Sequence, residues 1–183
     1  IDREMPMNAF TNAMRRAVSG VSIVTTSGDF GRYGLTVSSM TSVSAEPPML
    51  LVCVNKSSVA HDAIAGNRRF AINVLSARQQ GLAASFAGSD AFGPAYDFSS
   101  GEWTVSSSGL PQLVNPAAVF ECDLDTALAA GTHSIFIGRV TRAYGAEETP
   151  LAYSNREYGV PIGLAAANGV PSSTKTVLEA RQA

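Results

Sequence analysis

This chain has few of the residues that usually carry acid–base chemistry or bind metals. Its 183 residues include two histidines and two cysteines, and Cys53 and Cys122 both lie in apolar, strand-like runs. The cysteines do not have the spacing of zinc ligands, and two of them do not make the disulfide framework of a small secreted domain. No nucleophile with a paired base can be assembled from the spacing. We therefore expect reduced core thiols and no metal site.

Charge and long apolar runs are also scarce. Charged residues make up 15% of the chain, the formal net charge is -2, and there is no long basic run, which argues against a nucleic-acid partner. No apolar stretch reaches the ~18 residues of a membrane-spanning helix. The N-terminal residues lack the charged and apolar segments of a signal peptide. We expect a soluble protein of the cytoplasm with no membrane partner.

Apolar residues, at 45%, are plentiful enough for a core, and the length favours one domain. Alternating and β-branched runs predict strands, and apolar residues at helical spacing predict short helices. The expected strands are a segment from Leu35 and residues 21–26, 49–54, 70–75, 103–105, 118–124, 133–142 and 150–153. The expected helices are residues 8–18 with Asn8 as N-cap, residues 60–65 capped by Ser57 or Ser58 and ended by Gly66, a helix from a Ser76/Gln79 capping box to Gly88, and residues 176–181.

Most connections between these strands are too short for parallel crossovers. No G-x-G-x-x-G follows a strand and there is no Walker A loop, which excludes the common α/β nucleotide-binding folds. The sequence therefore predicts a mainly β protein, an antiparallel barrel or sandwich with short helices at its ends. Residues 88–102 show no periodicity, and we expect a long loop of the kind that often covers a site.

Two hydroxyl-rich segments flank the apolar run at residues 49–54. Thr36, Ser38 and Ser39 precede it, and Asn-Lys-Ser-Ser at residues 55–58 follows it. Hydroxyls, backbone N–H groups and a single ammonium are the donors that a phosphate needs, and the start of a helix favours anions. The alternatives are an ordinary helix cap with an exposed lysine, and the polar outer face of a half-exposed strand.

His133 is the candidate for a role beside reacting atoms. It opens a predicted strand directly after a turn, where an imidazole could orient a substrate; the alternative is a strand-end histidine that bonds a turn carbonyl. His61 lies among polar neighbours on a predicted helix, and we interpret it as a surface residue. A candidate phosphate site with so few acid–base side chains suits a cofactor that carries its own chemistry.

Taken in order, these segments resemble the short-chain flavin reductases, the reductase components of two-component flavin-dependent monooxygenases. The clearest matches are Gly-Leu-Thr-Val-Ser-Ser at 34–39, Cys-Val-Asn-Lys-Ser-Ser at 53–58, Phe-Ala-Ile-Asn-Val-Leu at 70–75, Leu-Ala-Ala-Ser-Phe-Ala at 82–87 and Gly-Thr-His at 131–133. Matches extend over nearly the whole chain up to about residue 160. The resemblance implies a split β-barrel domain over residues 1–160, usually in a homodimer, and leaves residues 161–183 as an extension that could pack on the partner subunit.

The resemblance also implies an NAD(P)H:flavin oxidoreductase. NADH or NADPH would deliver a hydride to FAD or FMN, and the reduced flavin would leave for a partner monooxygenase. The residues implied to line the flavin ring are Thr36, Val37, Ser38 and Ser39, those implied to hold the ribityl chain and phosphate are Cys53, Asn55, Lys56, Ser57 and Ser58, and those near the ring are Phe86, Ala87 and Tyr158. His133 matches a histidine placed where nicotinamide meets flavin. The family usually has Gly-Asp-His where this chain has Gly-Thr-His, so the charge state and role of His133 stay open.

Two other functions are compatible with the same sequence. A split-barrel protein that carries or stores flavin without reducing it would use the same residues. A pyridoxine-phosphate-type oxidase would share the barrel, but that family is more basic around its phosphate than Lys56 alone would make this chain. The sequence does not distinguish FAD from FMN, or NADH from NADPH.

Overall fold

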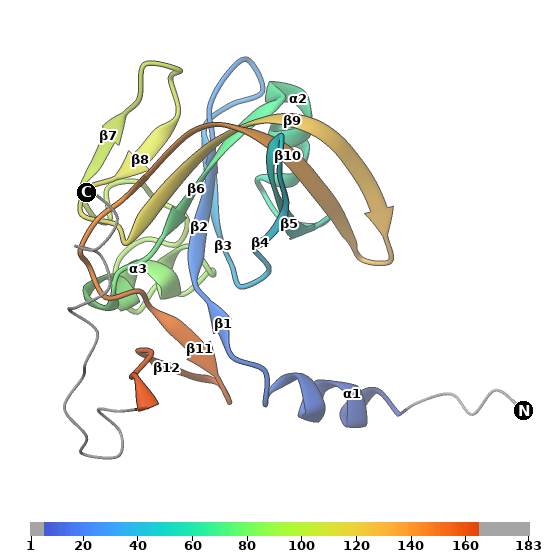
Figure 1. Cartoon of the computed structure of the whole chain (residues 1–183), viewed down its shortest axis with the longest axis vertical. Coiled ribbons are helices and arrows are strands. Elements are labelled where there is room, and N and C mark those ends of the chain that lie inside the picture. Colours follow the sequence, from blue (N-terminus) through green and yellow to red (C-terminus); the bar gives the residue numbers. More distant parts are fainter. Residues whose placement is uncertain (1–5, 165–183) are drawn as a thin grey trace, which may run out of the picture.

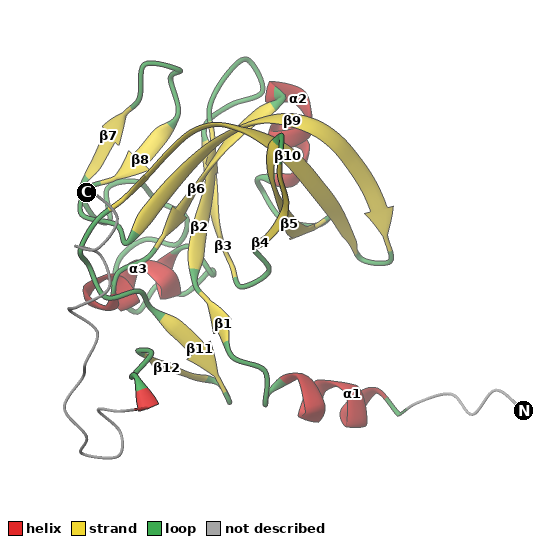
Figure 2. Cartoon of the chain, viewed as in Figure 1, coloured by secondary structure: helices red, strands yellow, loops and turns green. Residues whose placement is uncertain are grey.

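A curved, seven-stranded antiparallel sheet forms the centre of the fold (Figures 1 and 2). The structure is a computed structural model that describes residues 6–164. The strand order in the sheet is β3-β2-β6-β9-β10-β5-β4. The strands are β2 (Ser22–Thr26), β3 (Tyr33–Val37), β4 (Thr41–Ala45), β5 (Pro48–Asn55), β6 (Arg69–Val74), β9 (Ala118–Ala130) and β10 (His133–Gly145).

The sheet bends round without closing. Its two edge strands, β3 and β4, follow one another in the chain and are joined by residues 38–40, but each pairs only with its other neighbour. Figure 1 shows β9 and β10 arching across the top of the molecule as one long hairpin. The prediction of an antiparallel split barrel is therefore confirmed.

Two smaller sheets flank the barrel. One consists of β1 (Ser19–Gly20), β11 (Ala152–Ser154) and β12 (Glu157–Gly159), in the order β1-β11-β12. The other is the hairpin of β7 (Trp103–Val105) and β8 (Pro111–Leu113). Strands β1, β4, β8 and β12 were not predicted as separate elements. The long loop at residues 88–102 was predicted, and it contains no helix or strand.

The helices are short: α1 (Met7–Met14), α2 (His61–Asn67), the 3-10 helix η1 (Ala77–Gln79) and α3 (Gln80–Ser85). The capping box at the start of η1 is confirmed, because Ser76 and Gln79 exchange side-chain and backbone hydrogen bonds. This box turns the chain sharply from β6 into α3. The helix expected at residues 176–181 lies outside the described residues.

The predicted bounds of three helices were wrong. α3 ends at Ser85 and not at Gly88. α1 begins after Pro6, so Asn8 is not its cap, and it ends at Met14 instead of residue 18. The chain has to become extended before Ser19 and Gly20, because these two residues pair with β11.

Both predicted ends of α2 were also wrong. This helix begins at His61, with Ala60 before it, and not at Ser57 or Ser58. It runs through Gly66 and ends at Asn67, where Arg68 adopts a left-handed conformation with φ of 57°. Residues 56–60 are therefore a loop and not the first turn of a helix.

β2 lies between two apolar clusters, which explains why all five of its residues are buried. Val24 faces the barrel interior, and Ile23 faces a second cluster beneath α3, because successive strand residues point to opposite sides. The interior cluster includes Val52, Val54, Ile64, Phe70, Ile72 and Phe136. The second cluster includes Val21, Leu75, Ala83, Phe86, Leu113 and Leu151.

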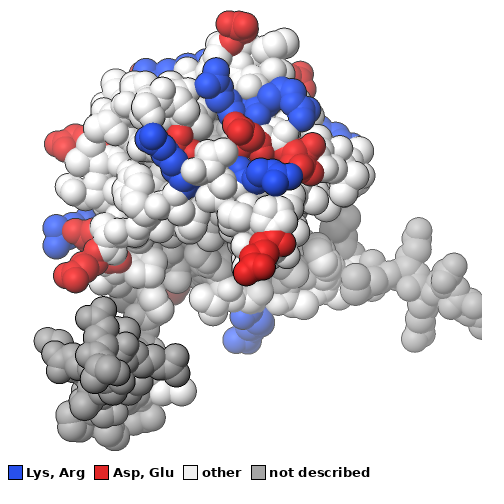
Figure 3. Space-filling view, turned by 45° about the horizontal axis from the view of Figure 1, so that its top comes forward, with Lys and Arg blue, Asp and Glu red and all other residues white. Residues whose placement is uncertain are grey.

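On the face shown in Figure 3, lysine and arginine side chains lie among aspartate and glutamate side chains and do not form a patch of one sign. Within residues 6–164, no helix has both the length and the apolar character needed to cross a bilayer.

Candidate functional site

Residues from four separate parts of the chain line a cavity of about 200 Å³. Its lining residues are Val21, Thr36, Val37, Ser38, Ala87, Tyr153 and Tyr158. Five of these seven were predicted as site residues from the sequence. They meet because β3 ends beside α3 and because the β11–β12 hairpin folds back under both. We call this cavity the ring cavity.

Thr36 ties β3 to the end of α3. Its backbone N–H donates a hydrogen bond to the Phe86 carbonyl at 2.8 Å, and its hydroxyl donates one to the Ala83 carbonyl at 2.9 Å. The Thr36 hydroxyl is therefore already committed within the protein. These two bonds set the position of Ala87 at the cavity wall.

The Phe86 side chain does not face the ring cavity. It is fully buried and packs against Phe98 and Trp103, with ring centroids 5.3 and 5.4 Å away. Gly34 allows this packing, since a Cβ there would lie 2.8 Å from a Phe86 ring carbon. Phe86 supports the cavity from behind, through its backbone and its packing.

Tyr153 is a cavity residue that the sequence reasoning missed. It pairs with Tyr158 across the β11–β12 hairpin, and the two ring centroids are 5.2 Å apart. The hairpin turn consists of Asn155 and Arg156, both at positive φ, as two-residue hairpin turns require. Burial, and then the neighbouring Tyr153, raise the pKa of the Tyr158 phenol, so this hydroxyl stays neutral at physiological pH.

The second group of predicted residues lies where β5 and β10 end side by side. Asn55 is directly opposite His133 in the paired strands. The Lys56 backbone N–H donates to the Thr132 carbonyl at 3.0 Å, and its ammonium donates to the Gly131 carbonyl at 2.8 Å. Lys56 is exposed, so the other N–H bonds of its ammonium face solvent.

The backbone N–H groups of residues 56–58 donate hydrogen bonds within the protein. This differs from the prediction, which had them at the start of a helix and free to bind a phosphate. The Asn55 side-chain oxygen accepts from both the backbone N–H and the hydroxyl of Ser57, each at 2.9 Å. The Asn55 carbonyl accepts from the Ser58 N–H at 3.0 Å. By contrast, Ser58 Oγ is the one buried side-chain oxygen or nitrogen in the described part of the chain without a hydrogen-bond partner.

The structure places His133 at this loop and not at the ring cavity. It is half-buried, and its Nδ1 shares a hydrogen bond of 2.9 Å with the Thr132 hydroxyl. Threonine thus supplies a neutral partner to the imidazole. We call residues 55–58 together with His133 the loop site.

Ser39 and Cys53 connect the two groups. The Ser39 hydroxyl accepts from the Cys53 N–H at 2.9 Å and donates to the Cys53 carbonyl at 3.0 Å. Ser39 follows the cavity residue Ser38, and Cys53 lies two residues before Asn55. These hydrogen bonds link the two groups. We call the predicted residues from Tyr158, through Ser39 and Cys53, to Lys56 the strip, and Phe86 packs behind its ring-cavity end.

His61 was interpreted as a surface residue, and this was wrong. Its side chain is 16% exposed, and its ring packs on Phe136 with centroids 5.4 Å apart. Nδ1 lies 2.7 Å from an Asp62 carboxylate oxygen, and Nε2 lies 2.9 Å from Ser134 Oγ. The sequence around His61 could not predict its contact with Ser134, because Ser134 is 73 residues away in the chain.

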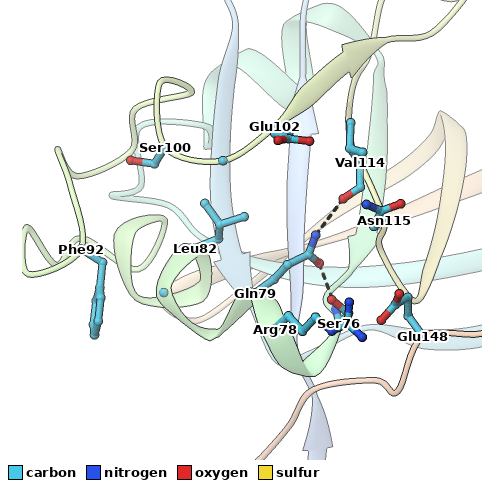
Figure 4. Close-up of a pocket in the computed structure, with 12 residues that line it drawn as sticks. Ser76, Arg78, Gln79, Leu82, Phe92, Ser100, Glu102, Val114, Asn115 and Glu148 are labelled. Atoms are coloured by element: carbon cyan, nitrogen blue, oxygen red, sulfur yellow. Dashed lines mark hydrogen bonds between the residues drawn. The ribbon is translucent and has the colours of Figure 1, made fainter.

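A larger cavity, about 590 Å³, lies apart from the strip, between η1, α3 and the 88–102 loop (Figure 4). Its polar wall is built on Gln79, whose amide donates to the Val114 carbonyl at 2.9 Å and accepts from the Ser76 N–H at 3.0 Å. The ring of Phe92 points away from the other labelled residues in Figure 4. None of the predicted site residues lines this cavity, so its size alone does not make it the functional site.

No group of three or more histidine, cysteine, aspartate or glutamate side chains within residues 6–164 is arranged to hold a metal ion.

Comparison with known proteins gives a consistent result. The model of the flavin reductase like domain family matches residues 14–160. FMN reductase (NADH) RutF of Variovorax paradoxus is 38% identical over 155 residues, which cover 84% of this chain and 85% of the relative. The reductase component of the FADH(2)-dependent resorcinol hydroxylase of a Rhizobium species is 38% identical over 162 residues, covering 86% and 89%.

Solved structures agree with the sequence comparison. Flavin reductase PheA2 superposes with a TM-score of 0.79 at 29% identity, covering 87% of this chain and all of the other. BorF, the flavin reductase component of a bacterial two-component tryptophan halogenase, gives a TM-score of 0.77 at 30% identity, covering 86% and 99%.

Proposed function

The chain belongs to the flavin reductase-like domain family and is an NADH:flavin oxidoreductase, and we propose that it holds its flavin along the strip from the ring cavity to the loop site. The flavin ring lies against Thr36, Val37 and Ser38, with Ala87 and Tyr158 at its edges. The ribityl chain passes Ser39 and Cys53. The phosphate lies at Asn55, Lys56, Ser57 and Ser58.

The observation that carries this assignment is the unpartnered Ser58 hydroxyl, in the same loop as Lys56, whose ammonium lies on an exposed side chain. A buried hydroxyl without a partner costs free energy, and a phosphate oxygen would satisfy it. An ammonium is a strong partner for the same group. Ser39 and Cys53 also link the ring cavity to the loop site, as a molecule with a ring at one end and a phosphate at the other requires.

A bound flavin supplies the redox chemistry by taking up the hydride that NADH gives. The protein's part is to bind and orient the two reactants, since transfer needs the rings at near-attack distance, ~3–3.5 Å, more than it needs a base. Tyr153 and Tyr158 wall the ring cavity and keep water from its edge. The neutral Tyr158 hydroxyl can donate a hydrogen bond, and His133, held by Thr132, stands at the phosphate end.

The same protein is proposed to work as a homodimer in the cytoplasm. α1 extends away from the barrel in Figure 1, and Phe10, Met14 and Val18 are 49%, 54% and 72% exposed. A helix this short is marginal in water without packing. A second copy that covers α1 would bury these side chains and also cover the groove that joins α1 to Ser38 and Tyr153. Residues 161–183 are proposed to add to this contact.

Reduced flavin is proposed to pass to a separate oxygenase. Relatives of this chain include the reductase components of a resorcinol hydroxylase and of a tryptophan halogenase, which act with such partners. The exposed position of Lys56 at one end of the strip suits a flavin that enters and leaves. Both FMN and FAD carry the phosphate that the loop site would hold.

The test is NADH oxidation, followed at the nicotinamide absorbance band, with all four combinations of NADH or NADPH and FMN or FAD. We expect loss of absorbance only when flavin is added. Failure with every combination would refute the reductase activity, and a yellow protein without turnover would favour the flavin carrier. Light scattering after size exclusion tests the dimer, and a Phe10→Ser/Met14→Ser variant should be monomeric.

A further inference from the structure

His61 belongs to neither the ring cavity nor the loop site, yet its side chain is held on three sides. We propose that His61 is a positioning residue for flavin binding: its hydrogen bond to Ser134 fixes the loop of residues 55–58, so that Lys56 and Ser58 stay in place for the phosphate. This inference rests on the proposed function of the loop site.

The loop is a short bridge with both ends on β10. At its start, Asn55 is the last residue of β5 and pairs with His133. At its end, His61 is the first residue of α2, and its Nε2 lies 2.9 Å from the Ser134 hydroxyl. Two successive residues of β10 therefore hold the two ends. The first attachment is part of the sheet. The second combines this side-chain hydrogen bond with the burial of Ala60 and Ile64 in the barrel interior, and only the hydrogen bond fixes the loop directly to β10.

The His61 ring is oriented for this bond. The Asp62 carboxylate, 2.7 Å from Nδ1, favours the tautomer with its proton on that nitrogen, which leaves Nε2 to accept from the Ser134 hydroxyl. The ring also packs on Phe136, and Ser134 is 7% exposed. Water competes little for a hydrogen bond in such a place, so the bond helps to hold the start of α2 at β10.

The hydrogen bonds that run from Asp62 through His61 to Ser134 resemble those of an Asp-His-Ser hydrolase triad. Ser134 does not serve as a nucleophile here, because it is buried and lines none of the cavities described above. A nucleophile needs room for a substrate carbonyl beside its oxygen. The chain of contacts is therefore structural support for the loop.

Losing this support should affect the kinetics with FMN and with riboflavin differently. Loosening the loop weakens contacts to the phosphate, but it leaves Thr36, Ser38 and Tyr158 around the ring. The KM for FMN should therefore rise, while kcat at saturating flavin should not change. Riboflavin has the same ring and lacks the phosphate, so its KM should not respond to the loop.

The experiment compares His61→Phe, which keeps a ring against Phe136 but has no Nε2, with Ser134→Ala. Each should raise the KM for FMN about three- to tenfold, the range expected for the loss of one hydrogen bond. The double variant should be no worse than either single variant, because both remove the same bond. His61→Gln, whose side-chain amide can reach the position of Nε2, should restore most of the affinity.

Thr25→Val is the matched control, because it removes a buried hydroxyl that donates to the Pro111 carbonyl at 2.6 Å, far from the loop. It should lower the melting temperature without raising the KM for FMN. Equal rises for FMN and riboflavin, or no rise in either His61→Phe or Ser134→Ala, would overturn the inference about His61. If wild-type protein binds riboflavin as tightly as FMN, the proposed phosphate site itself is wrong.

Discussion

The Ser39 hydroxyl bonds both backbone polar groups of Cys53, accepting from the N–H at 2.9 Å and donating to the carbonyl at 3.0 Å. β4 pairs with β5 only as far as Leu51, so it does not reach Cys53. The Ser39 side chain thus makes the two hydrogen bonds to Cys53 that a longer β4 would otherwise make. It holds the link between β3 and β4 across the split of the barrel, midway along the proposed flavin strip.

Replacing this hydroxyl should affect both stability and flavin binding. Ser39→Ala leaves the Cys53 N–H and carbonyl unpaired in a half-buried place, which should cost about 1–3 kcal/mol of unfolding free energy. The KM for flavin should rise as well, because ring cavity and loop site lose their connection. Urea denaturation and steady-state kinetics measure the two effects. Ser42→Ala, in the exposed part of β4, is the control, and equal behaviour of the two variants would contradict the role of Ser39.

Removing the Lys56 charge should weaken phosphate binding specifically. Lys56→Met should raise the KM for FMN about tenfold, as expected for the loss of a charge-assisted bond. The KM for riboflavin should not change, and added salt should affect the variant less than the wild type. Lys56→Arg keeps the charge and serves as the control. Because Lys56 is exposed, the melting temperature should stay nearly constant; a large fall would mean that the bond to Gly131 matters more.

A methyl group at Gly34 should disrupt the back of the ring cavity. A Cβ there would lie 2.8 and 3.0 Å from two carbons of the Phe86 ring, which Phe98 and Trp103 hold in place. Gly34→Ala should therefore destabilise the fold by about 1–3 kcal/mol and shift α3 away from Thr36. Gly20→Ala is the control, since nothing lies within 4 Å of a Cβ at Gly20. Thermal unfolding of the two variants gives the comparison.

The Cys122 thiol should make the fold sensitive to high pH. Burial, and then the nearby charges of Asp123 and Glu121, raise the pKa of Cys122 from 9.0 to about 12. Because the folded-state pKa is raised, the associated stability is complete below pH 9.0 and is lost as the pH rises towards about 12.

The urea midpoint of the wild type should therefore fall more steeply over that pH range than the midpoint of Cys122→Ala. Parallel curves would contradict the raised pKa. In the native protein near pH 8, a thiol reagent should modify Cys53, which is partly exposed, well before Cys122.

Most of the framework could be predicted from local patterns. Residues 21–26, 70–75 and 118–124 are β-branched or alternating, and each became part of a strand. The Ser76/Gln79 pair was also readable, because a capping box is complete within four residues. α1 was predicted too long because its end depends on β11, a segment more than a hundred residues away in the chain.

Residues with distant partners could not be assigned in the same way. His61 looked superficial because its sequence neighbours are polar, whereas Ser134 and Phe136 enclose it in the fold. Tyr153 could have been found from the two-residue turn at Asn155 and Arg156, which marks a hairpin that pairs it with Tyr158.

By itself, the sequence determined most of the longer strand segments, the antiparallel connections and the two hydroxyl-rich segments, since side-chain alternation, loop length and hydroxyl content are all local properties. Only the tertiary structure decided which of those hydroxyls are free. It committed Thr36 to α3 and Ser39 to Cys53, and it left Ser58 without a partner. The reason is physical: a polar group bonds whatever the sheet brings within reach, and that depends on strands far apart in the chain.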